Sequence, residues 1–200
     1  MFTRRLLPWR GFLLATDIAP AMCAAGREAL PQVTWQTLAA DAPEGGPWDW
    51  IFCSSMLQWV AEPEEIFAAW RRCLAGDGRI LAGLFVADTL PEWRELTGQA
   101  DPLIWRTADE WRACLARSGL RVVRDAVERR VFRHASALAL LRSLHGTGAA
   151  PERRLAPGRL RRLLREYDSR HGSAEGVGAT WTFYRFEARR AENRISNAHG

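Results

Sequence analysis

Residues 12–17 read Phe-Leu-Leu-Ala-Thr-Asp, an apolar run that ends in a carboxylate. We expect a short buried strand here, because Pro20 follows at the first turn of a helix-prone stretch that lasts to Leu30. A second strand is predicted over 33–38 and leads to Asp41. The order strand, helix, strand is typical of a parallel sheet.

The rest of the chain continues this alternation and predicts an α/β fold. Residues 2–9 resemble the end of a helix, and 48–54 are a nearly all-apolar strand of the kind that is buried on both faces. The remaining expected elements are a helix from Pro63 that ends at Gly76-Asp77-Gly78, a strand over 79–87, a helix opened by the capping-box pattern Thr107-x-x-Glu110, a strand over 120–132, helical segments within 134–171 and a last strand over 180–188. We therefore assign 1–133 and 179–190 to the core, 134–178 to a helical cap inserted before the last strand, and 191–200 to a flexible tail.

Composition indicates the general class of the protein but does not identify its binding partner. Two hundred residues suit one domain, and the net charge is +5 with all 28 basic residues being arginine. A basic surface attracts acidic proteins, nucleic acid or anionic lipid, and charge alone does not choose among them. The four cysteines are scattered, so we expect reduced thiols and neither a disulfide framework nor a metal site. No apolar run approaches membrane-spanning length, which favours a cytoplasmic protein.

Two carboxylates are the first candidates for a binding site. Asp17 and Asp41 each follow a predicted strand, and ligands of open α/β sheets bind along the carboxyl edge. One carboxylate there can accept hydrogen bonds from both ribose hydroxyls, and a second can accept one from an adenine amino group. Together they describe an adenosine site, although an Asp at a strand-to-helix junction can also serve only as a helix N-cap.

A set of motifs resembles the class I S-adenosylmethionine-dependent methyltransferases. The matching runs are residues 15–22 (Ala-Thr-Asp-Ile-Ala-Pro-Ala-Met), 40–42 (Ala-Asp-Ala), 48–55 (Trp-Asp-Trp-Ile-Phe-Cys-Ser-Ser) and 76–79 (Gly-Asp-Gly-Arg). The resemblance implies a Rossmann-like sheet with S-adenosylmethionine as cofactor. It also implies a cofactor site made of Asp17 and Ile18 at the ribose, Asp41 and Ala42 at the adenine, and Cys53, Ser54 and Ser55 at the end of the next strand.

Further motifs narrow the resemblance. Residues 54–59 (Ser-Ser-Met-Leu-Gln-Trp), 89–93 (Thr-Leu-Pro-Glu-Trp) and 140–149 (Leu-Leu-Arg-Ser-Leu-His-Gly-Thr-Gly-Ala) are similar to the malonyl-[acyl-carrier protein] O-methyltransferases of biotin synthesis. This similarity implies methylation of the free carboxylate of malonyl-acyl-carrier protein. A related branch, which includes respiratory complex assembly factors and an arginine hydroxylase, is the nearest competitor.

The implied reaction needs few catalytic groups. A carboxylate is already ionised at pH 7, so its methylation requires positioning and no general base, and we assign no catalytic residue. Arg142 can grip the malonyl carboxylate through its planar fork, while Gln58 and Trp59 shape the pocket and His145 lies near it. The alternatives are a surface role for Arg142, a core position for Trp59 and a helix-end position for His145.

A group of arginines in the predicted cap is the candidate partner site. It consists of Arg153, Arg154, Arg159, Arg161, Arg162 and Arg165. Such a run can be simply a solvated helix face, or it can dock an acidic acyl-carrier protein. We find no recognition helix or stacking motif that favours nucleic acid.

The start of the printed sequence bears on cofactor binding. In the resembling family, a first strand and a Gly-x-Gly turn come before the segment that matches residues 2–7. We therefore expect the sheet to be N-terminally incomplete, with the strands ending at Asp17 and Ser54 lacking a shared neighbour, and we expect these 200 residues to bind the cofactor weakly. The alternative function is a truncated, catalytically inactive methyltransferase-like protein that acts as a binding or assembly factor.

Overall fold

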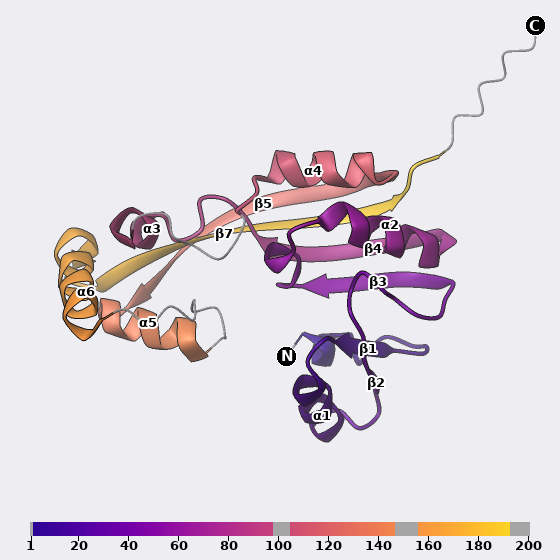
Figure 1. The fold of residues 1–200 in the computed structure, drawn as a ribbon, viewed down its shortest axis with the longest axis horizontal. Coiled ribbons are helices and arrows are strands. Elements are labelled where there is room, and N and C mark those ends of the chain that lie inside the picture. The colour runs from indigo at the N-terminus through magenta and orange to yellow at the C-terminus, as the bar shows by residue number, and fades with distance from the viewer. Residues whose placement is uncertain (1, 98–104, 147–155, 193–200) are drawn as a thin grey trace, which may run out of the picture.

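The computed structural model describes residues 2–97, 105–146 and 156–192 (Figure 1). Their elements, in chain order, are the 3-10 helix η1 (Thr3–Leu6), β1 (Leu14–Asp17), α1 (Pro20–Ala29), β2 (Thr34–Thr37), β3 (Trp48–Ser54), the 3-10 helix η2 (Leu57–Trp59), α2 (Pro63–Cys73), β4 (Leu74–Phe85), α3 (Pro91–Thr97), α4 (Ala108–Arg117), β5 (Leu120–His134), α5 (Ala137–Gly146), α6 (Pro157–His171), β6 (Gly172–Ser173) and β7 (Gly176–Arg190).

The strands form two separate sheets. β1 and β2 pair in parallel, with Asp17 opposite Thr37. The larger sheet has the order β3-β4-β7-β5, with β6 beside β7; β3 and β4 are parallel, and β7 runs antiparallel to both β4 and β5. Among the described residues, β1 and β3 pair neither with each other nor with a shared neighbour, as expected.

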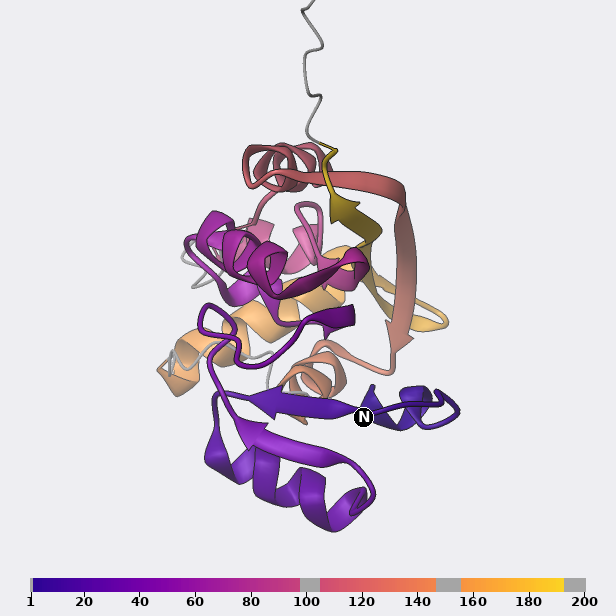
Figure 2. The same cartoon turned by 90° about the vertical axis from the view of Figure 1, so that its right-hand side faces the viewer.

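Helices α2 and α4 cover one face of the larger sheet (Figure 2). The predicted apolar stripe of α2 places Phe67 and Trp70 in the core, where the Phe67 ring meets the edges of Trp70, Trp111 and Phe186. These side chains are at most 5% exposed. The alternating residues of β4 and β7 complete this core, so it determines how the larger sheet and its two helices pack.

The N-terminal unit, which we define as residues 14–37, lies beyond β3 (Figure 1). Its own buried apolar residues are few: Cys23, Leu30 and Val33. The segment before it contacts β3 through aromatic rings, since Phe2 and Trp9 both pack against Phe52. Ring contacts, and not strand pairing, thus connect this end of the chain to the larger sheet.

A second apolar core lies at the opposite end of the molecule. It joins α3, α5, α6 and the start of β7 through residues that include Leu90, Leu140, Leu144 and Tyr167. We call α5 and α6 the helical pair. The C-terminal end of α5 points toward the N-terminal unit (Figure 1).

The structure corrects three boundaries. The helix from Pro63 ends at Cys73, and Gly76-Asp77-Gly78 lies inside β4, because β4 already begins to pair with Trp48 at Leu74. A Cβ on Gly78 would stand 2.7 Å from the Trp48 carbonyl oxygen, so glycine here permits close strand approach and not a helix end. The last strand starts at Gly176, earlier than predicted, because its ladder with β5 extends to the pair His134–Val177. Finally, the helical stretch expected over 2–9 is only the single turn of η1.

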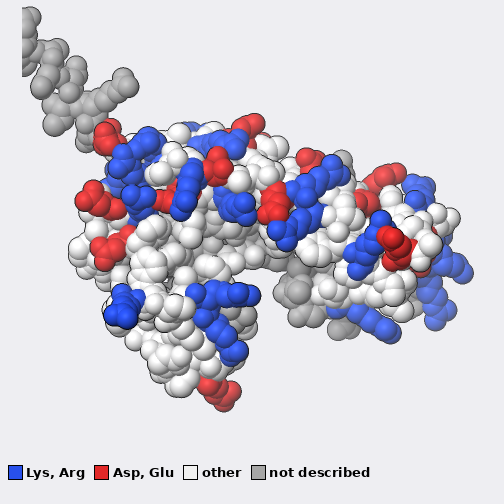
Figure 3. Space-filling view, turned by 180° about the vertical axis from the view of Figure 1, so that it is seen from behind, with Lys and Arg blue, Asp and Glu red and all other residues white. Residues whose placement is uncertain are grey.

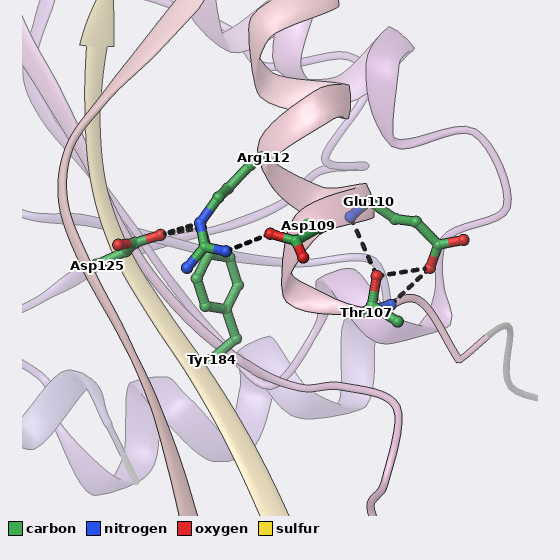
Figure 4. Close-up of polar contacts among 6 residues, drawn as sticks. All are labelled: Thr107, Asp109, Glu110, Arg112, Asp125 and Tyr184. Atoms are coloured by element: carbon green, nitrogen blue, oxygen red, sulfur yellow. Dashed lines mark hydrogen bonds and ion pairs between the residues drawn. The ribbon is translucent and has the colours of Figure 1, made fainter.

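The predicted capping box is confirmed (Figure 4). The Glu110 backbone N–H donates to Thr107 Oγ1 at 3.2 Å, and the Thr107 N–H donates to Glu110 Oε2 at 2.6 Å. One turn later, Arg112 donates to Asp125 Oδ2 at 2.6 Å, and the Tyr184 hydroxyl donates to the same oxygen at 2.8 Å. These contacts fix α4 on β5 and β7.

Candidate functional site

Asp17 is the last residue of β1 and lies at the carboxyl edge of the two-stranded sheet. Its Oδ1 accepts a hydrogen bond from the Ala19 N–H at 2.9 Å in the turn before α1, and Oδ2 has no partner among the described residues. Asp17 is not the N-cap of α1, because that position is Ala19 and no side chain caps the helix. The buried Cys23 thiol donates to the Asp17 carbonyl at 3.6 Å and to the Gln36 carbonyl at 3.3 Å. The carboxylate is therefore held at the edge with one oxygen available, and Ile18 beside it is 74% exposed.

Asp41 stands at the same edge, in the turn that follows β2. The Leu38 N–H donates to the Asp17 carbonyl at 3.0 Å, which keeps the start of this turn beside β1. Trp70 Nε1 donates to the Ala40 carbonyl at 2.8 Å and so anchors the loop to α2. Asp41 and Ala42 are exposed, so their surface is open to a ligand.

The end of β3 supplies a second group of candidate residues. Ser54 and Ser55 are exposed, whereas Cys53 is buried, and burial raises the pKa of its thiol to about 12. The thiol is thus protonated at neutral pH and is no nucleophile. Ser55 has a φ of 55°, a left-handed conformation that a non-glycine residue rarely adopts, and its N–H donates to the Gly83 carbonyl at 2.8 Å.

The Gln58 side chain stabilises the turn at Ser55 that follows β3. Its Nε2 donates to the Ser55 carbonyl at 2.9 Å, and the side chain is only 4% exposed. Its buried Oε1 has no hydrogen-bond partner among the described residues, so a donor on a ligand could satisfy it. Trp59, by contrast, is 48% exposed and is a surface side chain in this structure.

Arg142 and His145 lie on α5 and are both exposed. Both lie in the second half of α5, and the C-terminal end of that helix points toward the N-terminal unit (Figure 1). Arg142 forms no ion pair with any described residue, which leaves its guanidinium free for an anion. The strand ends therefore provide carboxylates, and the helical pair provides a cation without an ion-pair partner among the described residues.

Sequence reasoning missed three supporting contacts. The apolar stripe of α2 gave no sign that Trp70 also holds the Asp41 loop, and nothing in the sequence marked Cys23 as the support of Asp17. The left-handed Ser55 was also missed, because it is neither glycine nor asparagine. These contacts position residues that the motifs did identify.

Other kinds of site find no support in the part of the chain that the structure describes. No group of three or more His, Cys, Asp or Glu residues there could hold a metal ion, and all four cysteines are free thiols. None of the described helices is both long and apolar enough to cross a bilayer.

Comparison with known proteins identifies the family. A family model described as "Methyltransferase domain" matches residues 1–82. Malonyl-[acyl-carrier protein] O-methyltransferase of Geobacter sulfurreducens is 31% identical over 191 residues, covering 85% of this chain and 72% of that protein. This chain belongs to the class I S-adenosylmethionine-dependent methyltransferases. The enzyme of the same name from Laribacter hongkongensis is 29% identical over 150 residues, and the match spans 66% of this chain and half of that protein.

Solved structures agree on the fold of this methyltransferase. A methyltransferase of unassigned activity from Bacillus halodurans has a TM-score of 0.69 at 12% identity, covering 95% of this chain and 87% of that one. Geranyl diphosphate methyltransferase in complex with S-adenosylmethionine has a TM-score of 0.58 at 11% identity, covering 95% and 73%. The predicted Rossmann-like class I fold is thereby confirmed.

The cofactor of the family is S-adenosylmethionine, and the residues present fit it. The free Oδ2 of Asp17 and the exposed carboxylate of Asp41 are acceptors, which suit the hydroxyl and amino donors of adenosine. The buried, unpartnered Oε1 of Gln58 is one more acceptor near the end of β3. When bound, the cofactor supplies an electrophilic methyl group on a sulfonium.

Proposed function

We propose that this methyltransferase methylates the free carboxylate of a malonyl group carried by an acyl-carrier protein. The observation that carries the proposal is the match to the Geobacter sulfurreducens enzyme, which extends over 85% of this chain and so includes the helical pair. A carboxylate substrate also suits a site without a general base, because its oxygen is ionised at neutral pH. Bound S-adenosylmethionine would supply the methyl group: a bond from the carboxylate oxygen to the methyl carbon would replace the carbon–sulfur bond and yield a methyl ester and a neutral thioether.

The residues of the chain would divide this work between binding and orientation. Asp17 with Ile18, and Asp41 with Ala42, would hold the adenosine, while the backbone at Ser54 and Ser55 would complete the cofactor site. Arg142 would hold the malonyl carboxylate by two parallel hydrogen bonds, leaving one oxygen lone pair for attack. Trp59 and His145 would line the approach and exclude water.

The exposed arginines of α6 support an acidic partner. Arg159, Arg161, Arg162 and Arg165 are exposed and form no ion pair with a described residue, and Figure 3 shows basic side chains projecting at the helical-pair end of the molecule. The Arg153 and Arg154 predicted to join them lie outside the described residues. We propose that this arginine face steers the carrier protein by long-range attraction, which salt weakens.

A transfer assay tests the proposal. The protein is incubated with S-adenosylmethionine and malonyl-carrier protein, and mass spectrometry of the carrier detects the added methyl group. We expect transfer by the wild type, little transfer by Arg142→Ala, and only partial recovery in Arg142→Lys, because lysine keeps the charge without the planar fork. Methylation of free malonate but not of the carrier would overturn the substrate while keeping the reaction class.

Calorimetric titration with S-adenosylhomocysteine tests the proposed cofactor-binding residues. Asp17→Ala and Asp41→Ala should each weaken binding by about 1.5–3 kcal/mol, the usual loss for a hydrogen bond to a charged group. Asp49→Ala is the matched control, because Asp49 is an exposed carboxylate at the opposite end of β3. Equal losses in all three variants would argue against an adenosine site at this edge.

A further inference from the structure

The motif Thr89-Leu90-Pro91-Glu92-Trp93 has no role in the site described so far. It connects the end of β4 to α3, and the structure bonds it to two buried threonines of β7. Thr180 is 3% exposed and Thr182 is 5% exposed, although they lie on the same face of β7 as the apolar Tyr184, Phe186 and Ala188. The burial of two hydroxyl side chains on an otherwise apolar face of the strand calls for hydrogen-bond partners.

Thr182 is bonded to the turn after β4 in both directions. Thr89 Oγ1 donates to the Thr182 carbonyl at 3.0 Å, and the Thr182 N–H donates back to Thr89 Oγ1 at 3.2 Å. Thr182 Oγ1 donates to the Asp88 carbonyl at 3.1 Å. Thr89 is fully buried, so this exchange takes place away from water.

Thr180 is bonded to the first turn of α3. Its N–H donates to Glu92 Oε2 at 3.2 Å, and its hydroxyl donates to Glu92 Oε1. The Leu90 N–H adds a bond to the Thr180 carbonyl at 2.7 Å. One carboxylate thus takes both donors of one threonine, an arrangement that fixes the direction in which α3 leaves the sheet.

The turn that these bonds hold is strained. Asp88 has a φ of 70° and Leu90 a φ of 50°, and neither is glycine. Residues persist in such conformations only where their surroundings impose them. The consequence at Leu90 is specific: the conformation directs its side chain, 8% exposed, into the core shared with Leu140 and Tyr167 of the helical pair.

We propose that Glu92, Thr89, Thr180 and Thr182 form a latch that positions the helical pair, and with it Arg142, over the carboxyl edge of the sheet. Through Leu90 the latch connects β4 to α5, and through the Trp93 ring, 5.8 Å from that of Tyr167, it connects α3 to α6. The three threonines are buried and Glu92 is partly buried, and a hydrogen-bonded network of this kind specifies one arrangement where an apolar contact would permit several. The latch residues are positioning residues, and this role rests on the proposed function of Arg142.

Kinetics of Glu92→Gln and Thr182→Val test the latch in the full chain. Each should raise the KM for malonyl-carrier protein roughly tenfold, since small misplacements of a binding group cost that much or more, while S-adenosylhomocysteine affinity stays within about twofold. Thr182→Ser keeps the hydroxyl and should restore the wild-type KM. Glu95→Gln is the matched control on the same helix, because that carboxylate is 64% exposed. Among the described residues its ion-pair partner is the half-exposed Arg170 of α6, and a surface pair of this kind contributes little to stability.

Hydrogen exchange separates failure of the latch from failure of the proposed function. Both variants should speed exchange in α5 and α6 and leave α2 and α4 unchanged, whether or not the wild type methylates this substrate. Unchanged exchange in α5, or a KM unaffected in both variants of an active enzyme, would overturn the latch. A parallel loss of cofactor affinity and of exchange protection in α2 and α4 would also overturn it, because that pattern means general destabilisation.

Discussion

The N-terminal unit and the larger sheet both contribute residues to the candidate site, yet they are supported very differently. β4 is paired on both sides and lies under α2 and α4, in a core that includes Phe67, Trp70 and Trp111. Among the described residues, β1 pairs with β2 alone, and it packs on α1. Asp17 therefore stands on the less buried part of the chain, where local opening costs less free energy. The Asp41 loop follows this unit and is also anchored to α2 through the Ala40 carbonyl.

The largest effect on stability is expected from truncating a side chain in the core of the larger sheet, and it should show that the two regions differ in stability. Phe67→Ala should lower the free energy of unfolding by about 3–5 kcal/mol, because it removes a fully buried ring that contacts three others. Leu30→Ala in the N-terminal unit should leave the main denaturant transition nearly in place and mainly speed amide exchange in α1. Equal shifts of the main transition in both variants would contradict the comparison.

A glycine substitution tests the packing of the N-terminal unit directly. A Cβ on Gly26 would stand 2.6 Å from the Trp35 ring, so Gly26→Ala must push that ring from its place on α1. Overpacking of this kind costs about 1–3 kcal/mol, and exchange in α1 and β2 should rise accordingly. Gly83→Ala in β4 is the control, since a Cβ there meets nothing within 4 Å and stability should hardly change.

The capping box tests how strongly α4 supports the larger sheet. Thr107→Ala removes the acceptor of the Glu110 N–H and should cost about 1 kcal/mol in chemical denaturation. The loss should appear in the single transition of the larger sheet and leave exchange in α1 unaltered. Thr107→Ser, which retains the hydroxyl, should behave like the wild type.

The smallest effect concerns pH and the other face of the larger sheet. Arg79, and then Arg124, hydrogen-bond the buried Glu187 and hold its carboxyl pKa below the usual 4.5. A depressed folded-state pKa contributes stability that is complete above 4.5 and is lost as the pH falls through the folded value. Unfolding free energy measured from pH 6 downward should therefore decline less steeply in Glu187→Gln, and an unchanged slope would exclude this contribution.

The local sequence pattern was enough to predict an element where neighbouring residues alone decide its structure. The strand Trp48–Ser54 is observed with its predicted bounds. Its predicted burial on both faces is wrong, because β3 is an edge strand of the larger sheet and only Cys53 in it is buried. The Thr107 capping box is a contact between near neighbours in the chain. Prediction failed at Gly76-Asp77-Gly78, which looks like a turn but is drawn into β4 by pairing with β3. It also missed α3, whose direction depends on bonds from Glu92 to the distant Thr180.

The sequence by itself determined the family, the order of the strands and helices apart from α3, and the two carboxylates at strand ends. These properties follow from residue identity and from neighbours along the chain, which motifs record directly. Only the tertiary structure decided which groups remain available: Asp17 uses one carboxylate oxygen to cap its own turn, Gln58 turns its amide to Ser55, and Thr180 and Thr182 are bonded to the turn beside β4. The bonds of Asp17 and Gln58 are to residues two and three positions away, whereas those of Thr180 and Thr182 join residues 88 and 94 positions apart. Burial obliges each polar group to find a partner wherever packing brings one, and only the folded chain shows which partner that is.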